Sequence, residues 1–208
     1  MGKLVSTIFV TLDGVYQAPG GPQEDTRDGF TQGGWSFAFA DEGFGGFVNE
    51  VFDGVGAFLL GRRTYDIFAS YWPKVTDPAH PVAGKLNALP KYVPSATLTD
   101  PRWAGTTVLG GDLAKEVTAL KETTDGELQV HGSGALVQSL LALDLVDTLH
   151  LLTFPVVLGT GLRFFAEGAV PTAFRHTAGR VTGAGVSIQT YDFAGRPNYG
   201  SFGPPEEA

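Results

Sequence analysis

Apolar positions along the chain recur with two different periods. Short apolar runs of the kind that form buried strands occur at residues 3–12, 57–60, 91–97, 106–111, 127–131 and 148–158. Between them, apolar residues repeat at helical spacing at residues 44–55, from residue 62 onward, and at residues 112–124 and 135–143. Asp112 is placed to cap the third of these helices. Because strands and helices alternate, we expect a mostly parallel sheet that helices cover on both faces.

Three segments depart from this alternation. Residues 13–43 are rich in glycine and predict a long loop, which inside a compact domain is usually functional or mobile. Residues 72–89 are rich in proline and predict a second loop. Residues 173–181 and 186–193 predict an antiparallel hairpin that turns through residues 182–185. No repeat, linker or change in composition interrupts the chain, so we expect one domain over residues 1–195 and a tail over residues 196–208 that ends in a frayed GPPEEA.

The composition is that of a globular protein that can bury a core. Of 208 residues, 43% are hydrophobic and 17% are charged. The net charge of −8 argues against nucleic acid or an anionic membrane as a partner, since clustered Lys and Arg would bind these. The absence of cysteine excludes disulfides, thiolate metal sites and cysteine nucleophiles. The chain shows neither a signal-peptide pattern nor an apolar stretch of membrane-spanning length, so a soluble cytoplasmic protein is expected by default.

Two strand-to-helix junctions share one design. The first, LLGRRTY, places Gly61 and two arginines at a helix start, and the second, VHGSGAL, places residues 132–134 there. Taken alone, the second junction indicates a tight turn that needs glycine, and the arginines indicate a solvated surface. Helix N-termini with free N–H groups also bind phosphate, and arginine binds phosphate bidentately. Two such junctions on one parallel sheet could hold the two ends of a dinucleotide beyond the carboxyl ends of the strands.

Other chemical motifs are absent from the sequence. There is no GxxxxGK[ST] phosphate loop, and GSGALV lacks the third glycine of the dinucleotide fingerprint. HGSG does not match GxSxG, which argues against Ser133 as a nucleophile. The four histidines, His80, His131, His150 and His176, are scattered without metal-ligand spacing. The sequence therefore predicts no metal site, and we interpret His150 as an ordinary strand residue.

Several segments together resemble one family. TLDGVY, LLGRRTYDIF, VHGSGALVQSLL and LHLLTFPVVLGTGLRFF are similar to the dihydrofolate reductase-like superfamily. They are more closely similar to the C-terminal reductase domain of the bifunctional riboflavin-biosynthesis deaminase-reductase and to its stand-alone relatives. The resemblance, which runs from about residue 3 to residue 193, implies a three-layer α/β/α fold with a mostly parallel central sheet and an antiparallel C-terminal hairpin. The zinc motif of the deaminase is missing, so the chain corresponds to the reductase unit alone.

The resemblance implies an NADPH-dependent oxidoreductase. Such an enzyme would transfer hydride to a small polar heterocyclic or sugar-derived substrate, similar to 5-amino-6-(5-phosphoribosylamino)uracil reductase of riboflavin biosynthesis. The alternatives are a nucleotide-binding or redox-sensing module without turnover, and a dihydrofolate reductase. The family also points to a homodimer. Phe165 ends an apolar segment, residues 157–165, which either a second subunit or the C-terminal hairpin of the same subunit could cover.

The same resemblance assigns the cofactor-binding residues. The first junction would contact the phosphates, with Arg62 placed for the 2′-phosphate, and the glycine-rich turn would hold the pyrophosphate. Ser95 matches a position near the adenosine. The end of the first strand and the loop after it, residues 11–16, match the position of the nicotinamide. The expected cofactor-binding residues are Thr11, Asp13, Gly14, Tyr16, Gly61, Arg62, Arg63, Thr64, Ser95, Gly132, Ser133, Gly134, Ala135 and Leu136.

The substrate side departs from the dihydrofolate reductase pattern. Those enzymes carry a carboxylate on the helix after the first loop, which holds the pterin and helps to protonate it. The nearest acids here, and therefore the expected proton donors, are Asp41, Glu42 and Glu50. The residue after the glycine turn, sometimes an arginine in those enzymes, is Ala135, and their pterin-binding strand threonine falls near Leu152. These departures disfavour pterin recognition. They do not affect the resemblance at the expected cofactor-binding residues.

Overall fold

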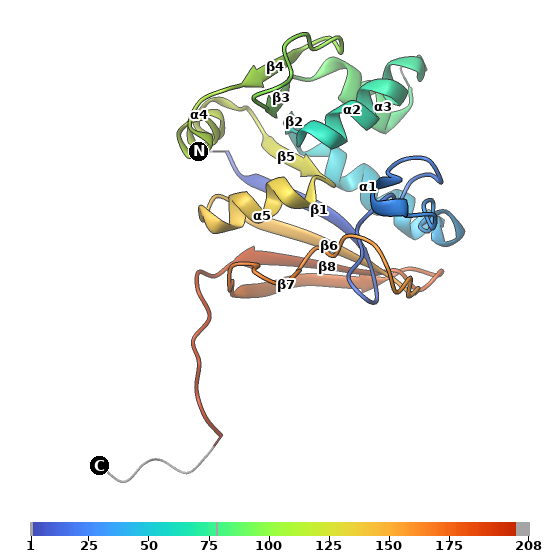
Figure 1. Ribbon diagram of the computed structural model, residues 1–208, viewed down its shortest axis with the longest axis vertical. Helices are drawn as coiled ribbons and strands as arrows, with labels where there is room; N and C mark the ends of the chain where they lie inside the picture. Colours follow the sequence, from blue (N-terminus) through green and yellow to red (C-terminus); the bar gives the residue numbers. More distant parts are fainter. Residues whose placement is uncertain (1, 78, 203–208) are drawn as a thin grey trace.

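The computed structural model describes residues 2–77 and 79–202, which build one eight-stranded sheet with helices on both faces (Figure 1). The strands are β1 (Leu4–Thr11), β2 (Val55–Leu59), β3 (Lys91–Pro94), β4 (Thr106–Leu109), β5 (Glu127–His131), β6 (Thr148–Phe154), β7 (Phe174–Val181) and β8 (Ser187–Phe193). The helices are α1 (Glu42–Asp53), α2 (Arg62–Tyr71), α3 (Pro81–Ala88), α4 (Leu113–Thr123) and α5 (Gly134–Ala142). Three 3-10 segments are η1 (Arg27–Gly29), η2 (Phe37–Phe39) and η3 (Trp72–Lys74).

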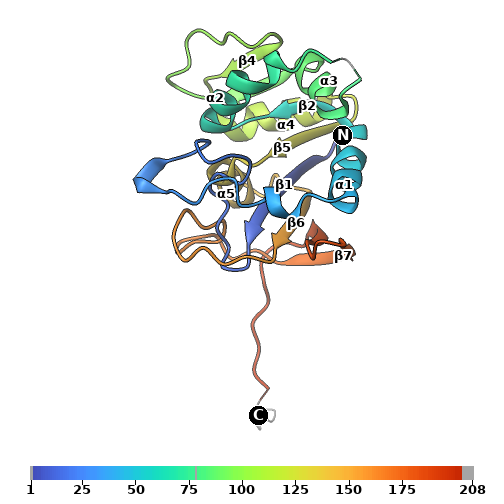
Figure 2. The same ribbon diagram turned by 90° about the vertical axis from the view of Figure 1, so that its right-hand side faces the viewer.

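The strand order is β4-β3-β2-β5-β1-β6-β8-β7. Strands β1 to β6 run parallel to one another, whereas β8 pairs antiparallel with both β6 and β7. Helices α4 and α5 pack on one face and α1, α2 and α3 on the other (Figures 1 and 2). The predicted three-layer fold, with a mostly parallel sheet and an antiparallel C-terminal hairpin, is confirmed.

The prediction of a loop over residues 72–89 is wrong. The segment contains η3 and the helix α3. Pro81 occupies the first turn of α3, and the Nδ1 atom of His80 caps it by accepting from the N–H of Ala83 at 3.2 Å. Proline suits that position because its fixed φ is helical and its missing N–H has no partner there anyway. Ala83 and Leu86 are then buried against the sheet, so packing rather than local composition decides this segment.

Aspartate side chains cap the N-termini of two helices that the sequence predicts. The Asp112 carboxylate accepts from the N–H of Lys115 at 2.9 Å, as expected, at the start of α4. Asp41 accepts from the N–H of Phe44 at 2.8 Å at the start of α1. Helix α1 forms despite its glycines because this cap satisfies a free donor and because Phe47, Val51 and Phe52 are buried.

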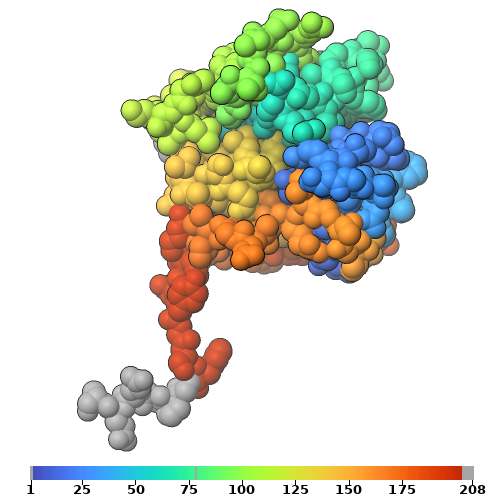
Figure 3. Space-filling model, in the orientation of Figure 1, coloured from blue at the N-terminus to red at the C-terminus, as the bar shows by residue number. Residues whose placement is uncertain are grey.

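The long loop at residues 13–43 is packed against the body of the protein. Phe30 and Trp35 are buried, and the Nε1–H of Trp35 donates to the carbonyl of Gln17 at 2.8 Å. Gln32 donates to the carbonyl of Leu158 at 3.1 Å, which joins the loop to the segment after β6. Figure 3 shows the two segments, blue and orange, side by side on the surface.

The end of the chain leaves the body. Tyr199 and Phe202 are exposed, and the red segment in Figure 3 extends away from the sheet. The predicted frayed segment GPPEEA lies outside the described residues. Among residues 2–77 and 79–202, no helix is both long enough and apolar enough to cross a bilayer.

Candidate nucleotide and substrate site

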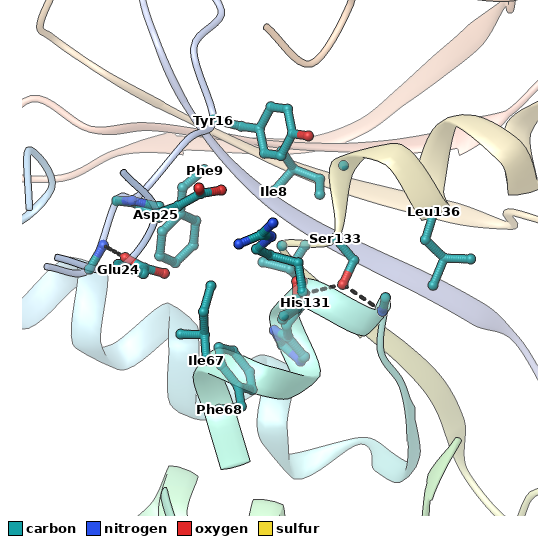
Figure 4. A pocket seen from close by; sticks show the side chains of 18 of the residues that line it. Ile8, Phe9, Tyr16, Glu24, Asp25, Ile67, Phe68, His131, Ser133 and Leu136 are labelled. Atoms are coloured by element: carbon teal, nitrogen blue, oxygen red, sulfur yellow. Dashed lines mark hydrogen bonds between the residues drawn. The ribbon is translucent and has the colours of Figure 1, made fainter. Parts of the chain in front are cut away.

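The two junctions singled out in the sequence meet in space. Strands β2 and β5 pair in parallel, so the turns that follow them emerge at the same edge of the sheet. The N–H of Gly61, at the start of α2, donates to the Oγ of Ser133 at 3.0 Å, which in turn donates to the carbonyl of His131 at 3.2 Å (Figure 4). This hydrogen-bonded link places the N-termini of α2 and α5 beside each other.

Both helix starts keep free N–H groups. The N-cap residues Gly61 and Ser133 make no side-chain cap hydrogen bond to α2 or α5, and in the first turn of α5 the backbone of Ala135 is hydrogen-bonded to Tyr16. Gly132 and Ser133 have φ values of 58° and 54°, the left-handed region that glycine adopts without strain and serine rarely does. The turn therefore needs unusual dihedrals, which agrees with the interpretation of VHGSGAL as a tight turn. The same geometry aims uncapped backbone donors outward, which is the property of an anion-binding site.

A cavity of about 690 Å³ opens at this edge of the sheet. It brings together most of the predicted cofactor-binding residues. Those that line it are Tyr16, Gly61, Arg62, Arg63, Thr64, Gly132, Ser133, Gly134, Ala135 and Leu136. Tyr16 covers the glycine turn closely, because a Cβ atom added to Gly134 would lie 2.6 Å from the Tyr16 ring.

The other predicted cofactor-binding residues are not among those that line the cavity. Thr11 and Asp13 bond to each other at 2.6 Å in the turn after β1. The Thr11 hydrogen bond, together with the N–H groups of Gly159 and Leu158, lowers the pKa of Asp13 to about 2, and Gly14 follows in the same turn with a φ of 80°. Asp13 thus joins the turn after β1 to the segment that follows β6.

Ser95 lies in the loop after β3, on the side of the cavity where α2 begins. Its Oγ accepts from the N–H of Thr97 at 3.2 Å, and the Oγ1 of Thr97 accepts from Arg62 at 3.2 Å. The Nε–H of Arg62 also donates to both carboxylate oxygens of Asp66, each at 3.0 Å. Arg62, Thr97 and Ser95 thus form one polar group at the rim.

A family model for the RibD C-terminal domain matches residues 2–188. The chain belongs to the RibD C-terminal domain family. The "Uncharacterized protein YyaP" of Bacillus subtilis (strain 168) is 28% identical over 167 residues, which cover 79% of this chain and 81% of YyaP. The similarity to YyaP therefore covers most of both chains.

Solved structures show the same fold at low sequence identity. The deaminase/5-amino-6-(5-phosphoribosylamino)uracil reductase of Thermotoga maritima superposes with a TM-score of 0.62 at 14% identity, over 93% of this chain and 57% of that one. Dihydrofolate reductase from Enterococcus faecalis, complexed with NADP(H) and RAB-propyl, superposes with a TM-score of 0.57 at 14% identity, over 92% of this chain and 96% of that one. These likenesses place the RibD C-terminal domain chain in the dihydrofolate reductase-like fold.

In this RibD C-terminal domain chain, the three acids expected to donate protons do not line the cavity. Asp41 caps α1 and also accepts from the N–H of Ala184 at 2.7 Å, and these hydrogen bonds lower the pKa of its carboxyl. Glu50 pairs with Arg180 at 2.8 Å, and Glu42 is exposed in the first turn of α1. None of the three is placed to reach a ligand in the cavity.

Two other acids do line the cavity, and sequence reasoning missed them. Glu24 and Asp25 come from the long loop, which we expected to be functional or mobile, but the sequence did not indicate which of its side chains point into the cavity. The Asp25 carboxylate accepts hydrogen bonds from the Arg27 guanidinium, at 2.8 Å from Nε to Oδ1, at 3.0 Å from Nε to Oδ2 and at 2.5 Å from Nη2 to Oδ2, and one from the Arg27 backbone N–H at 3.2 Å. The only local signal was the sequence EDTR, in which an acid and an arginine two residues apart can pair.

His131 is a further cavity residue that the sequence did not single out. Its ring stacks on Phe52 with centroids 4.6 Å apart, and its Nε2 lies 2.9 Å from the Oε1 of Gln129. Burial lowers the pKa of His131 to about 3 and that of His150, two strands away on β6, to about 4. Both imidazoles are therefore neutral at pH 7, and His131 can offer a ligand a neutral ring but not a cation.

The rest of the cavity is apolar. It runs between α1 and α2 toward α3, away from the two helix starts. The side chains that line this part are Ile8, Phe9, Phe44, Phe47, Val48, Val51, Phe52, Ile67, Phe68, Trp72, Val82 and Leu86. The site thus has a polar half at the N-termini of α2 and α5 and an apolar half between the helices.

Proposed function

We propose that this protein is an NADPH-dependent reductase. The observation that carries the proposal is the Gly61–Ser133 hydrogen bond, because it sets two uncapped helix N-termini and two arginines on one cavity wall. A dinucleotide with three phosphates needs such a surface. Membership of the RibD C-terminal domain family and the NADP(H) complex of a protein with the same fold support the same assignment.

The residues present fit the cofactor. The N–H groups at Gly134 and Ala135 would receive the pyrophosphate, which would take the place of the Tyr16 hydroxyl at Ala135. Arg62, with Thr97 and Ser95 beside it, would receive the 2′-phosphate at the rim, and the nicotinamide would reach toward the apolar half. When bound, the cofactor supplies hydride, while the protein orients the reacting rings and excludes water.

Binding and turnover are tested separately. Calorimetric titration of NADPH into the purified protein should give a saturable 1:1 isotherm per chain, and NADH should bind more weakly. Loss of reduced-nicotinamide absorbance in the presence of a panel of heterocyclic imines and carbonyl compounds then reports turnover.

The outcomes separate the candidate functions. No NADPH binding would refute the reductase and the nucleotide-binding module alike. Binding without oxidation by any member of the panel would favour the nucleotide-binding or redox-sensing module. Reduction of dihydrofolate would instead favour a dihydrofolate reductase.

A further inference from the structure

Three side chains of β5 form one hydrogen-bonded array beneath α1. Glu127, Gln129 and His131 alternate along the strand, so their side chains point to the same face of the sheet. The Nε2 of Gln129 donates to the carbonyl of Val51 in α1 at 2.6 Å and to the Oε2 of Glu127 at 2.7 Å. Its Oε1 lies 2.9 Å from the Nε2 of His131. His131 is the end of the array that lines the cavity (Figure 4).

The contact with Val51 decides which way the Gln129 amide faces. A backbone carbonyl only accepts, so the amide nitrogen faces Val51 and the amide oxygen faces His131. Because that oxygen also only accepts, the Nε2 of His131 carries the proton. The His131 ring packs on Phe52 and Phe58, at 4.6 and 5.8 Å between centroids, and apolar surroundings favour a neutral imidazole. The Nδ1 of His131 is therefore a bare hydrogen-bond acceptor.

This Nδ1 atom is open to the cavity. It makes no hydrogen bond to the described residues, since the ring bonds to Gln129 through Nε2 alone. Within residues 2–77 and 79–202, the buried side-chain nitrogen or oxygen atom that lacks a partner is the Oγ of Ser6. The unpaired Nδ1 is thus accessible, and His131 lines the cavity. A ligand in the cavity can therefore donate to it.

Thr7 lies next to His131 on the neighbouring strand β1. The two residues are paired in register, and both line the cavity. Thr7 is only 5% exposed, yet its hydroxyl makes no hydrogen bond to the described part of the chain. Buried polar groups in folded proteins are nearly always paired. An unpaired hydroxyl in a cavity wall therefore marks a point where a ligand can bond.

The walls around this pair are apolar. Phe9 follows Thr7 on the same face of β1, and Phe9, Phe44 and Phe52 line the same cavity. In such surroundings a ligand that cannot pair with a polar group of the site is disfavoured, because that group loses water without gaining a partner. The pair thus selects ligands by hydrogen bonding as well as by shape.

We propose that Thr7 and His131 determine ligand specificity by binding an amide edge, which is an N–H next to a C=O. The Nδ1 of His131 accepts from the N–H, and the hydroxyl of Thr7 donates to the C=O. This inference deepens the proposed function and rests on it. The carboxamide of the nicotinamide and a lactam ring of the substrate both present such an edge. Gln129 is a positioning residue, because it fixes the tautomer of His131 without touching the ligand.

The tautomer of His131 is tested first, in the wild-type protein. With nitrogen-15-labelled histidine, a long-range proton–nitrogen correlation spectrum at pH 7 distinguishes a protonated ring nitrogen from a bare one, and His131→Phe assigns the signals. We expect Nε2 to be protonated and Nδ1 to be bare. The opposite tautomer would overturn the inference. Gln129→Met removes the amide oxygen and should let both tautomers exchange, whereas an unchanged spectrum would remove Gln129 from the positioning role.

Three bicyclic probes of similar shape then test the amide edge. Oxindole offers an N–H next to a C=O, indole offers the N–H alone, and benzofuran offers neither. Each hydrogen bond should raise the affinity about fivefold. By ligand-observed NMR, oxindole should therefore bind most tightly, indole less tightly and benzofuran least. Equal affinities for the three probes would overturn the inference.

Two variants assign the contacts. Thr7→Val should lower the affinity for oxindole to that for indole and leave indole and benzofuran unchanged. His131→Phe should lower the affinity for indole to that for benzofuran, while oxindole still binds about fivefold more tightly than indole. A difference that persists in the variant meant to remove it would overturn the inference.

Matched controls change the same residue types outside the cavity. Thr107→Val, on the exposed side of β4, and His176→Phe, on the exposed strand β7, should bind the three probes as the wild-type protein does. The wild-type spectrum and the wild-type order of the probes decide the inference even where a variant does not fold.

An analogue of NADPH separates the two sources of the amide edge. In the acetylpyridine analogue an acetyl group replaces the carboxamide, which keeps the C=O and removes the N–H. If His131 binds the nicotinamide, calorimetry should show that the wild-type protein prefers NADPH about fivefold and that His131→Phe does not. The same preference in both proteins, with the probes in the expected order, assigns the pair to a lactam of the substrate.

Titration of NADPH also keeps the two proposals apart. If NADPH binds but the three probes bind equally, only the inference about Thr7 and His131 falls. If NADPH does not bind, the proposed function falls whatever the probes show.

Discussion

Arg62, which we propose as a phosphate ligand, also makes a contact within the fold. It is half-exposed and paired with Asp66 one helical turn later at 3.0 Å. An exposed pair of this kind contributes little to stability, so the arginine is free to exchange its partner for a phosphate. In the proposed complex, Asp66 would compete with that phosphate for Arg62.

The first prediction concerns cofactor preference. Arg62→Ala should weaken NADPH binding by about 1.5–3 kcal/mol, the contribution of a charge-assisted phosphate contact, and should change NADH binding much less. Asp66→Asn should strengthen NADPH binding, because it removes the competing carboxylate. Calorimetry measures both, with Arg102→Ala in the exposed Arg102–Asp100 pair as the control. Equal losses for the two cofactors would remove Arg62 from this role.

A second prediction at the residue scale concerns Gly134. In Gly134→Val, the new side chain would collide with the Tyr16 ring, since even a Cβ would lie 2.6 Å from it. We expect the melting temperature to fall and NADPH binding to be lost. Gly134→Ala should be milder, and adding Tyr16→Ala to it should restore part of the melting temperature. A Gly134→Val protein that melts as wild type and still binds NADPH would show that the turn is merely structural.

At the scale of elements, β5 and β6 carry two neutral histidines under α1. His131 stacks on Phe52, and His150 contacts Phe47 at 5.3 Å between ring centroids and Thr190 at 3.0 Å. Burial depresses both pKa values, to about 3 and about 4. In the unfolded chain these imidazoles take up protons near their ordinary value of 6.5.

The third prediction is the pH dependence that follows. Between about pH 6.5 and pH 4 the unfolded state binds protons that the folded state does not, so stability present above pH 6.5 is lost as pH falls. Each histidine can contribute up to about 1.4 kcal/mol per pH unit. Glu24, with its raised pKa, acts in the opposite direction, so single variants isolate the histidines.

Urea unfolding at a series of pH values measures this. His131→Gln should flatten the decline in unfolding free energy between pH 6.5 and pH 4. The comparison variant His176→Gln removes a histidine from the exposed outer strand β7 instead of from beneath α1. Parallel slopes for wild type and His131→Gln would show that folding does not lower the pKa of His131.

At the scale of the whole molecule, the C-terminal edge of the sheet is open. Every residue of β7 after Phe174 is exposed. Phe164 is buried, so packing within one chain covers part of the apolar segment at residues 157–165, whereas Phe165 stays 52% exposed. An exposed strand edge with an apolar side chain nearby is a surface on which a second subunit could pair.

The fourth prediction is therefore a homodimer, which we propose from the family resemblance and from this exposed edge. Light scattering at micromolar concentration should give about twice the chain mass of 22.0 kDa. Phe165→Asp should dissociate the dimer, because a charge in a desolvated apolar contact is strongly unfavourable. Phe37→Asp, at a position that is 84% exposed, is the matched control. A monomeric wild-type protein would refute the dimer, and a dimer that Phe165→Asp leaves intact would place the interface elsewhere.

The sequence by itself determined the sheet-and-helix alternation, the C-terminal hairpin, the Asp112 cap and the two glycine-containing junctions. Those features depend on the spacing of apolar residues and on turn chemistry, which act within a few neighbouring residues. It did not determine that the proline-rich segment forms α3, that Asp41 caps a helix, or that Glu24 and His131 line the cavity. Which way these side chains point depends on how Trp35 and Phe30 anchor the long loop and on how β5 lies beneath α1. Only tertiary packing, which joins residues far apart in the chain, decides those positions.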